Sequence, residues 1–248
     1  MSVQFFTPRG SSNELVKLPT AYRRKVKWLP QIGDIFPDFT VNTTEGEVRF
    51  WEWAAGSWVH LFSHPAAFTP VCTTEIASMA AQRDEWAAND IKLLGLTGSS
   101  VPELMDWHAD IEDFFDVTVS FPSAHDPGLQ LSRLFGMVHE KEATDWPIRK
   151  SFIIDPGLHV QVVTEYPIYI GRNSEEILRV TQALQLRART GAGTPSDWYD
   201  GDVAIIPDHI PESDVVAHFG TASTRVKPYL RLAAPAEDMA PSVVPFAR

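Results

Sequence analysis

The sequence WVHLFSHPAAFTPVCTTE, residues 58–75, is the most informative segment about the chain's architecture. Its first six residues, 58–63, are mostly apolar and have the length of a buried strand. Residues 64–71 contain two prolines, and from Cys72 onward apolar side chains recur at helical spacing as far as Trp86. The stretch therefore predicts a buried strand that leads directly into a helix, with Cys72 in the first turn of that helix.

Outward from this stretch, apolar segments alternate with capping and turn residues. We predict short strands within 31–53, a strand at 91–98, and then a helix that Ser100 caps and whose apolar stripe ends at Phe114 and Phe115. A short helix within 125–137 should follow, and then an antiparallel hairpin of strands 151–155 and 159–165 about a turn at 155–157. The last predicted element is a long helix that Ser174 caps and Gly191 ends. The second hairpin strand, 159–165, is a candidate for the edge of the sheet.

This order of elements predicts an α/β protein with a mixed central sheet. A helix that starts with a cysteine directly after a central strand indicates the thioredoxin-like fold. We divide the chain into an N-terminal extension (1–28), a thioredoxin-like domain (29–191) and a small C-terminal domain or arm (192–248), where Pro, Asp and aromatic residues become frequent.

Composition excludes several classes of protein. The 248 residues are 44% hydrophobic and 21% charged, which is ordinary for a globular chain and excludes disorder or coiled coil as a global description. The net charge of −11 disfavours nucleic acid as a partner, and no apolar run is long enough to span a membrane. Residues 1–28 carry six basic residues against Glu14 alone and lack the apolar core of a signal peptide, so we expect a solvated arm and a cytoplasmic protein.

Cys72 is the only cysteine, so neither an internal disulfide nor a thiolate-rich zinc site is expected. A lone cysteine is most often a small buried apolar residue. Its position at a helix start changes this expectation, because the free N–H groups and the helix dipole stabilise a thiolate. Thr69 lies three residues earlier, where its hydroxyl can bond the sulfur or a bound oxygen. The residues predict a single activated thiolate.

The spacing Pro65-x-x-x-Thr69-x-x-Cys72 resembles the signature of the peroxiredoxins, at the expected junction of strand and helix. The longer string FSHPAAFTPVCTTE resembles the 1-Cys branch with a long C-terminal arm, the peroxiredoxin-six type of the AhpC/TSA family. The resemblance runs from about residue 29 to 232 and includes the segments RKSFIID, YPIYIGRN and TPSDWYDGD.

The resemblance implies a role for each matching residue. Cys72 is the peroxidatic nucleophile, Thr69 orients the peroxide, Pro65 shields the thiolate from water, and the charge of Arg149 stabilises the thiolate and the breaking O–O bond. The resemblance also implies that Glu75 and Arg172 buttress this arginine, and that His64 lies near the thiol.

Each of the supporting residues also has a structural interpretation. Arg149 precedes a strand, where arginines are usually solvated, and Arg172 stands where it can cap or pair at a helix start. His64 can equally be a packing residue. Glu75, taken to lie in the first helical turn, would favour the helix dipole in any protein.

The chain departs from the branch at two places. Ala66 and Ala67 replace a pair that is often charged, at the rim of the pocket. Some relatives are assigned a phospholipase with a Ser, a His and an Asp; Ser57 matches the serine, but the other positions hold Trp51 and Gly157. Because a serine without a general base is a weak nucleophile, we do not expect this activity.

The sequence therefore predicts an antioxidant enzyme, a thiol peroxidase that reduces hydrogen peroxide and small organic hydroperoxides through Cys72, without a cofactor or metal. An external thiol of unknown identity must regenerate the cysteine. The resemblance implies a homodimer or a ring of dimers. The alternative is a redox-sensing or chaperone-like oligomer that uses the same cysteine.

Overall fold

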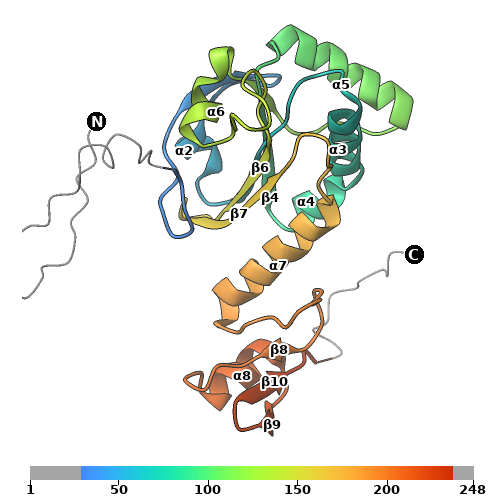
Figure 1. Cartoon of the computed structure of the whole chain (residues 1–248). Helices are drawn as coiled ribbons and strands as arrows, with labels where there is room; N and C mark the ends of the chain where they lie inside the picture. The colour runs from blue at the N-terminus through green and yellow to red at the C-terminus, as the bar shows by residue number, and fades with distance from the viewer. Residues whose placement is uncertain (1–28, 237–248) are drawn as a thin grey trace, which may run out of the picture.

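A mixed seven-stranded sheet forms the centre of the protein, in a computed structural model that describes residues 29–236 (Figure 1). The strand order is β2-β1-β5-β4-β3-β6-β7. The strands are β1 (Thr40–Thr43), β2 (Gly46–Arg49), β3 (Trp58–Ser63), β4 (Ile91–Thr97), β5 (Ser123–His125), β6 (Arg149–Ile154) and β7 (Val160–Tyr166). Pairs β3–β4 and β4–β5 are parallel and the others are antiparallel, which confirms the predicted α/β fold with a mixed sheet.

Helices cover both faces of this sheet. They are α2 (Phe50–Ala54), α3 (Pro70–Ala81), α4 (Arg83–Ala88), α5 (Val101–Phe115), the 3-10 turn η1 (Pro127–Leu129), α6 (Gln130–Leu134) and α7 (Ser174–Thr190). Figure 1 shows α2 and α6 on one side of the sheet and α3, α4 and α5 on the other. Within residues 29–236, no helix combines the length and the apolar character that a membrane crossing needs.

Strand β3 lies in the interior of the sheet, and all six of its residues are buried. Side chains alternate along a strand, so β3 feeds both cores. Val59 and Leu61 pack with Phe36 in the core beneath α2 and α6, whereas Phe62 packs with Ile76 of α3 in the core on the other face. The position of β3 between two cores explains why it is apolar on both faces. From the end of β3 the chain continues through a short loop to the start of α3.

Three local predictions were wrong. Residues 50–54 form α2 rather than a strand end. Phe114 is 78% exposed and Phe115 is 38% exposed, because the buried stripe of α5 ends at Ile111. Helix α7 is capped by Asn173, whose side chain accepts a hydrogen bond from the backbone N–H of Glu176, and Ser174 is its first residue.

A smaller C-terminal unit follows α7 and lies beyond its end in Figure 1. It consists of β8 (Ala204–Ile205), α8 (Glu212–Phe219), β9 (Thr224–Lys227) and β10 (Leu230–Ala233), with the strands in the order β8-β10-β9. Its own core joins Trp198 and Phe219 to Leu186 of α7. The predicted extension 1–28 and the last residues of the predicted arm, 237–248, lie outside the described residues.

Candidate active site

The loop between β3 and α3 is fastened to the neighbouring strand β4 and to the turn that follows it. The backbone N–H of His64 donates to the Leu96 carbonyl at 3.2 Å, and the carbonyl of buried Pro65 accepts from the Thr97 hydroxyl at 3.1 Å. Phe68 then adopts a left-handed backbone with φ of 54°, which is uncommon for a residue with a side chain. These contacts hold the start of α3 in a fixed direction.

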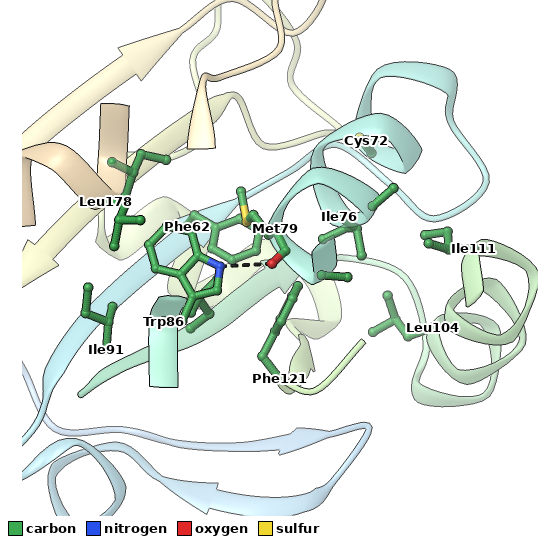
Figure 2. Close-up of a cluster of buried hydrophobic side chains, with 14 of the residues drawn as sticks. Phe62, Cys72, Ile76, Met79, Trp86, Ile91, Leu104, Ile111, Phe121 and Leu178 are labelled. Atoms are coloured by element: carbon green, nitrogen blue, oxygen red, sulfur yellow. Dashed lines mark hydrogen bonds between the residues drawn. The ribbon is translucent and has the colours of Figure 1, made fainter. Parts of the chain in front are cut away.

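Cys72 is the third residue of α3 and has no exposed surface. Its side chain lies at the edge of the cluster of buried apolar side chains that also contains Ile76 and Leu104 (Figure 2). The helix begins after Thr69, so Cys72 sits within the turn whose N–H groups lack partners in the helix, where a negative charge is favoured. The structure therefore places the thiol where the sequence predicted it.

Arg149 is the first residue of β6 and approaches the thiol directly. Its Nη1 donates to Cys72 Sγ at 3.3 Å and to Glu75 Oε2 at 2.6 Å. Its Nε and Nη2 both donate to the carbonyl of Ile168, at 2.8 and 2.6 Å. The guanidinium is 2% exposed and is fixed from three directions, so the solvated interpretation of this arginine is wrong.

Glu75 joins this arginine to a second one, Arg172. The Oε1 atom of Glu75 accepts from the backbone N–H and Nε of Arg172 at 2.7 and 2.9 Å, and its Oε2 accepts from Nη2 at 2.9 Å. Burial raises the pKa of Glu75, but the charge and hydrogen bonds of Arg172 and the charge of Arg149 together lower it by more, so the pKa lies below its usual value. Two guanidinium charges and one carboxylate leave one positive charge unbalanced beside the sulfur, which favours the thiolate form of Cys72.

The helix-dipole interpretation of Glu75 is wrong. Glu75 is the sixth residue of α3, and the first turn of this helix holds no acidic residue. The carboxylate is instead 4% exposed and bound to two arginines. Its position is set by these pairs, because a buried carboxylate without partners would be costly.

Thr69 and Pro65 flank the thiol from the loop. The Thr69 hydroxyl donates to the Ala66 carbonyl at 2.8 Å, which leaves its oxygen lone pairs free to accept a hydrogen bond. Pro65 is buried and its ring carries no donor, so its side chain is apolar while its carbonyl accepts from Thr97.

His64 is fully buried between aromatic rings, with its ring centroid 5.3 Å from Trp107 and 6.2 Å from Phe62. Neither ring nitrogen has a hydrogen-bond partner within residues 29–236. Burial, opposed by the charge of Glu75 and assisted by the two arginines and His108, lowers its pKa to about 3. The ring is therefore neutral near pH 7 and contacts its surroundings through packing.

The second candidate nucleophile, Ser57, has none of the residues of this cluster as a hydrogen-bond partner. Its hydroxyl donates to the Asp90 carboxylate at 3.1 Å, and the indole N–H of Trp51 donates to the Phe36 carbonyl at 2.7 Å. No histidine within residues 29–236 hydrogen-bonds Ser57.

Sequence analysis missed three groups of the site. They are the Ile168 carbonyl, which holds Arg149, and the side chains of Ser151 and His60, which hydrogen-bond each other at 3.0 Å behind Arg172. A backbone carbonyl leaves no trace in a sequence. His60 leaves one signal, which is a histidine within a mostly apolar strand, whereas Ser151 follows Arg149 and Lys150 in β6 and leaves none.

Comparison with known proteins agrees with this geometry. Residues 32–163 match the AhpC/TSA family. Mitochondrial peroxiredoxin PRX1 of Saccharomyces cerevisiae is 38% identical over 208 residues, which cover 81% of this chain and 79% of that protein. The solved peroxiredoxin 6 of Arenicola marina aligns with a TM-score of 0.76 and 31% identity, covering 84% of this chain and 99% of that one. The yeast mitochondrial 1-Cys peroxiredoxin aligns with a TM-score of 0.75 and 35% identity, covering 83% and 100%.

The buried histidines predict how stability depends on pH. Burial lowers the pKa of His64 to about 3 and that of His108 to about 4, whereas a histidine of the unfolded chain has a pKa near 6.5. Below pH 6.5 the unfolded chain therefore binds protons at these two histidines, and the native state does not. The free energy of unfolding should therefore fall as pH drops below 6.5, by up to about 1.4 kcal/mol per pH unit for each histidine. Urea denaturation between pH 5 and 6.5 measures this, in a range above the titration of the carboxylates.

His64→Leu should reduce this slope by one proton, whereas His209→Asn, a change of an exposed histidine, should leave it unchanged. Equal slopes for the wild type and His64→Leu would contradict the interpretation.

Proposed function

Since the chain belongs to the AhpC/TSA family and is a thiol peroxidase that uses a single cysteine, we propose that the residues around Cys72 divide the reaction as follows. The Cys72 thiolate attacks the terminal oxygen of the peroxide, and its electron pair forms the S–O bond while the O–O bond breaks. The sulfur becomes a sulfenic acid, and the other oxygen leaves as hydroxide or alkoxide, which takes up from solvent the equivalent of the proton that the thiol lost on ionisation and so becomes water or an alcohol. Thr69 accepts a hydrogen bond from the peroxide O–H and so orients it.

The observation that carries this proposal is the shared Nη1 atom of Arg149. This atom touches both Glu75 and the sulfur, so its charge lies beside the oxygen that the sulfur attacks. As the O–O bond breaks, negative charge moves onto the leaving oxygen, and a fixed cation stabilises this charge without rearrangement. Pro65 keeps water from the thiolate, Glu75 and Arg172 hold Arg149, and His64 packs beside the thiol.

The reductant is an external thiol, because Cys72 is the only cysteine of the chain. We propose glutathione or a thioredoxin-like protein. The support is by similarity: the thiol resolving mechanism of the yeast mitochondrial 1-Cys peroxiredoxin runs via glutathione/thioredoxin systems. Steady turnover with either reductant separates a peroxidase from the alternative, a redox sensor, which would be oxidised once and would not turn over.

We also propose a homodimer or a ring of dimers. Strand β7 is the edge of the seven-stranded sheet, next to β6, and its residues are mostly half-buried in the single chain. The start of this edge is already paired within the chain, since the Val160 N–H donates to the Asp34 carbonyl at 2.9 Å, and the rest of the strand offers its outward backbone groups to a second copy. Pairing of two β7 strands would extend the sheet across both protomers.

The cytoplasm is the location we propose, on the grounds of the lone cysteine and the absence of an apolar signal core in residues 1–28. One similar protein is named mitochondrial, and residues 1–28 are basic. Subcellular fractionation of the source cells tests the proposal, and recovery of the chain in an organelle instead of the cytosol would refute it.

Replacement of the nucleophile is the direct test of the reaction. Cys72→Ser should abolish peroxide consumption and leave the fold intact, because a serine hydroxyl is not ionised near pH 7 while its size is similar. Peroxide loss is followed with excess dithiothreitol as reductant, and circular dichroism checks the fold. Ser57→Ala is the matched control and should keep full activity. Substantial peroxidase activity in Cys72→Ser would contradict the proposed mechanism.

Lack of a resolving thiol predicts inactivation by excess peroxide. A second peroxide should convert the sulfenate to a sulfinate, with a second molecule of water or alcohol released, and ordinary thiols do not reverse this step. Mass spectrometry should find two added oxygens on the Cys72 peptide, and later addition of thiol should not restore activity. Formation of a Cys72–Cys72 disulfide between chains, with full recovery of activity when thiol is added, would contradict this prediction of irreversible inactivation.

The proposed dimer predicts a mass in solution that is an even multiple of 27.7 kDa. It also predicts slow amide hydrogen exchange along β7 after Val160, since the outward N–H groups of that part of the edge would be bonded to the second copy, whereas the Val160 N–H is bonded to Asp34 in the single chain. Light scattering at micromolar concentration measures the mass. A monomer at that concentration, with rapidly exchanging β7 amides, is the outcome that rules out the edge-to-edge dimer.

A further inference from the structure

A polar pair lies inside the sheet, behind the active site. Ser151 of β6 and His60 of β3 are 3% and 0% exposed, and their side chains hydrogen-bond at 3.0 Å. The His60 ring stacks on Phe62 at 4.9 Å, and Ile153 is its partner on β6. Neither polar residue has a part in the reaction described above. Because polar groups in a core cost stability unless they are well paired, their presence needs a reason.

The pair connects to the thiol through a continuous series of contacts. Ser151 Oγ accepts a hydrogen bond from Arg172 Nη1 at 3.1 Å, and the only other acceptor within reach of Nη1 among the described residues is the Lys150 carbonyl at 3.4 Å. The series then runs through the groups already described, in the order His60, Ser151, Arg172, Glu75, Arg149 and Cys72.

The chemistry of donors and acceptors fixes the direction of these bonds. A guanidinium only donates, so the Ser151 oxygen accepts from Arg172 and its hydroxyl proton is free for His60. The Nε2 atom of His60 must then be unprotonated, which assigns the tautomer by the network. Burial and, after it, the charge of Arg172 hold the pKa of His60 well below its usual value, so the ring stays neutral.

His60 is imperfectly satisfied as a core residue. Its Nδ1 atom is buried and has no hydrogen-bond partner within residues 29–236. An unpaired buried polar atom lowers stability. A leucine at this position of β3 would avoid that cost and would suit the apolar neighbours, so stability alone does not account for the histidine.

We propose that His60 and Ser151 are positioning residues of the peroxidase site, an inference that rests on the proposed role of Cys72. His60 orients the Ser151 hydroxyl, and Ser151 holds the guanidinium plane of Arg172. This plane also lies 5.1 Å over the Phe62 ring, and at that angle its Nε and Nη2 both meet Glu75.

Arg172 affects the reaction through one atom, Arg149 Nη1. Glu75 Oε2 shares Arg149 Nη1 with the sulfur. A guanidinium of Arg172 that is free to turn would let Glu75 shift and would draw Nη1 away from Cys72. The expected defect is therefore in the attack on peroxide, and not in the later reduction by an external thiol.

Variants at both positions test the proposal. Ser151→Ala and His60→Leu should each lower the rate constant for oxidation of Cys72 by hydrogen peroxide about tenfold, the effect of one lost hydrogen bond. Stopped-flow tryptophan fluorescence follows this single turnover. The double variant should lose no more than the larger single loss, since both changes break one series. Ser151→Thr and His60→Gln keep a hydroxyl and an acceptor and should recover most of the rate.

Two further readouts separate positioning from a structural role. Ile153→Val, on the same face of β6, changes packing only and should keep the wild-type rate. His60→Leu removes the unpaired nitrogen but also removes the acceptor of the buried Ser151 hydroxyl, and these two effects on stability oppose each other. Its thermal stability should therefore stay close to that of the wild type while its peroxide rate falls. The rate of reduction of the sulfenic acid by thiol should be unchanged in every variant.

Folded Ser151→Ala and His60→Leu proteins with wild-type peroxide rate constants would overturn the proposal. Rate losses that simply follow losses of thermal stability, with Ile153→Val equally impaired, would overturn it too. Either result leaves the role of Cys72 intact, because that role fails only if the wild type lacks peroxidase activity or Cys72→Ser retains it.

Discussion

One buried carboxylate, that of Glu75, holds two guanidinium groups, and the active site depends on this arrangement. Glu75 balances one of the two charges, and the other lies beside the Cys72 sulfur, with Arg149 Nη1 at 3.3 Å. A fixed cation at that distance favours a negative charge on the sulfur. The site is therefore electrically complete only when the sulfur is ionised, which is the form that attacks a peroxide.

The sheet topology makes this arrangement possible. Strands β3 and β6 are antiparallel neighbours, so the start of β6, which carries Arg149, lies beside the end of β3, where the loop to Cys72 begins. Arg172 arrives from the segment before α7 and reaches Glu75 across 97 residues of sequence. The groups are held by burial and by mutual hydrogen bonds, since Arg149 and Arg172 are 2% and 8% exposed and both bind Glu75 of α3.

Prediction from sequence succeeded where the signal was local and failed where it was distant. Apolar runs and helical spacing located β3, α3 and Cys72, because strand length and helix start are encoded within a few residues. The roles of Arg149 and Arg172 came from resemblance alone, since nothing in their neighbourhoods shows that both meet Glu75. Phe114 was misplaced because helical spacing continues past the point where the core ends. The partnership of His60 with Ser151 is set by strand pairing across 91 residues, which no local pattern reveals.

The most direct test of this account replaces Arg149 by lysine and measures the rate constant of Cys72 oxidation by hydrogen peroxide in a single turnover. One ammonium cannot serve the Ile168 carbonyl, Glu75 and the sulfur together, as the planar guanidinium does. With Arg49→Lys as an exposed control, we predict a fall of about a hundredfold or more in Arg149→Lys, comparable to loss of a preorganised donor in other enzymes, and no change in the control. A folded Arg149→Lys protein that reacts at the wild-type rate would contradict the central role of this guanidinium.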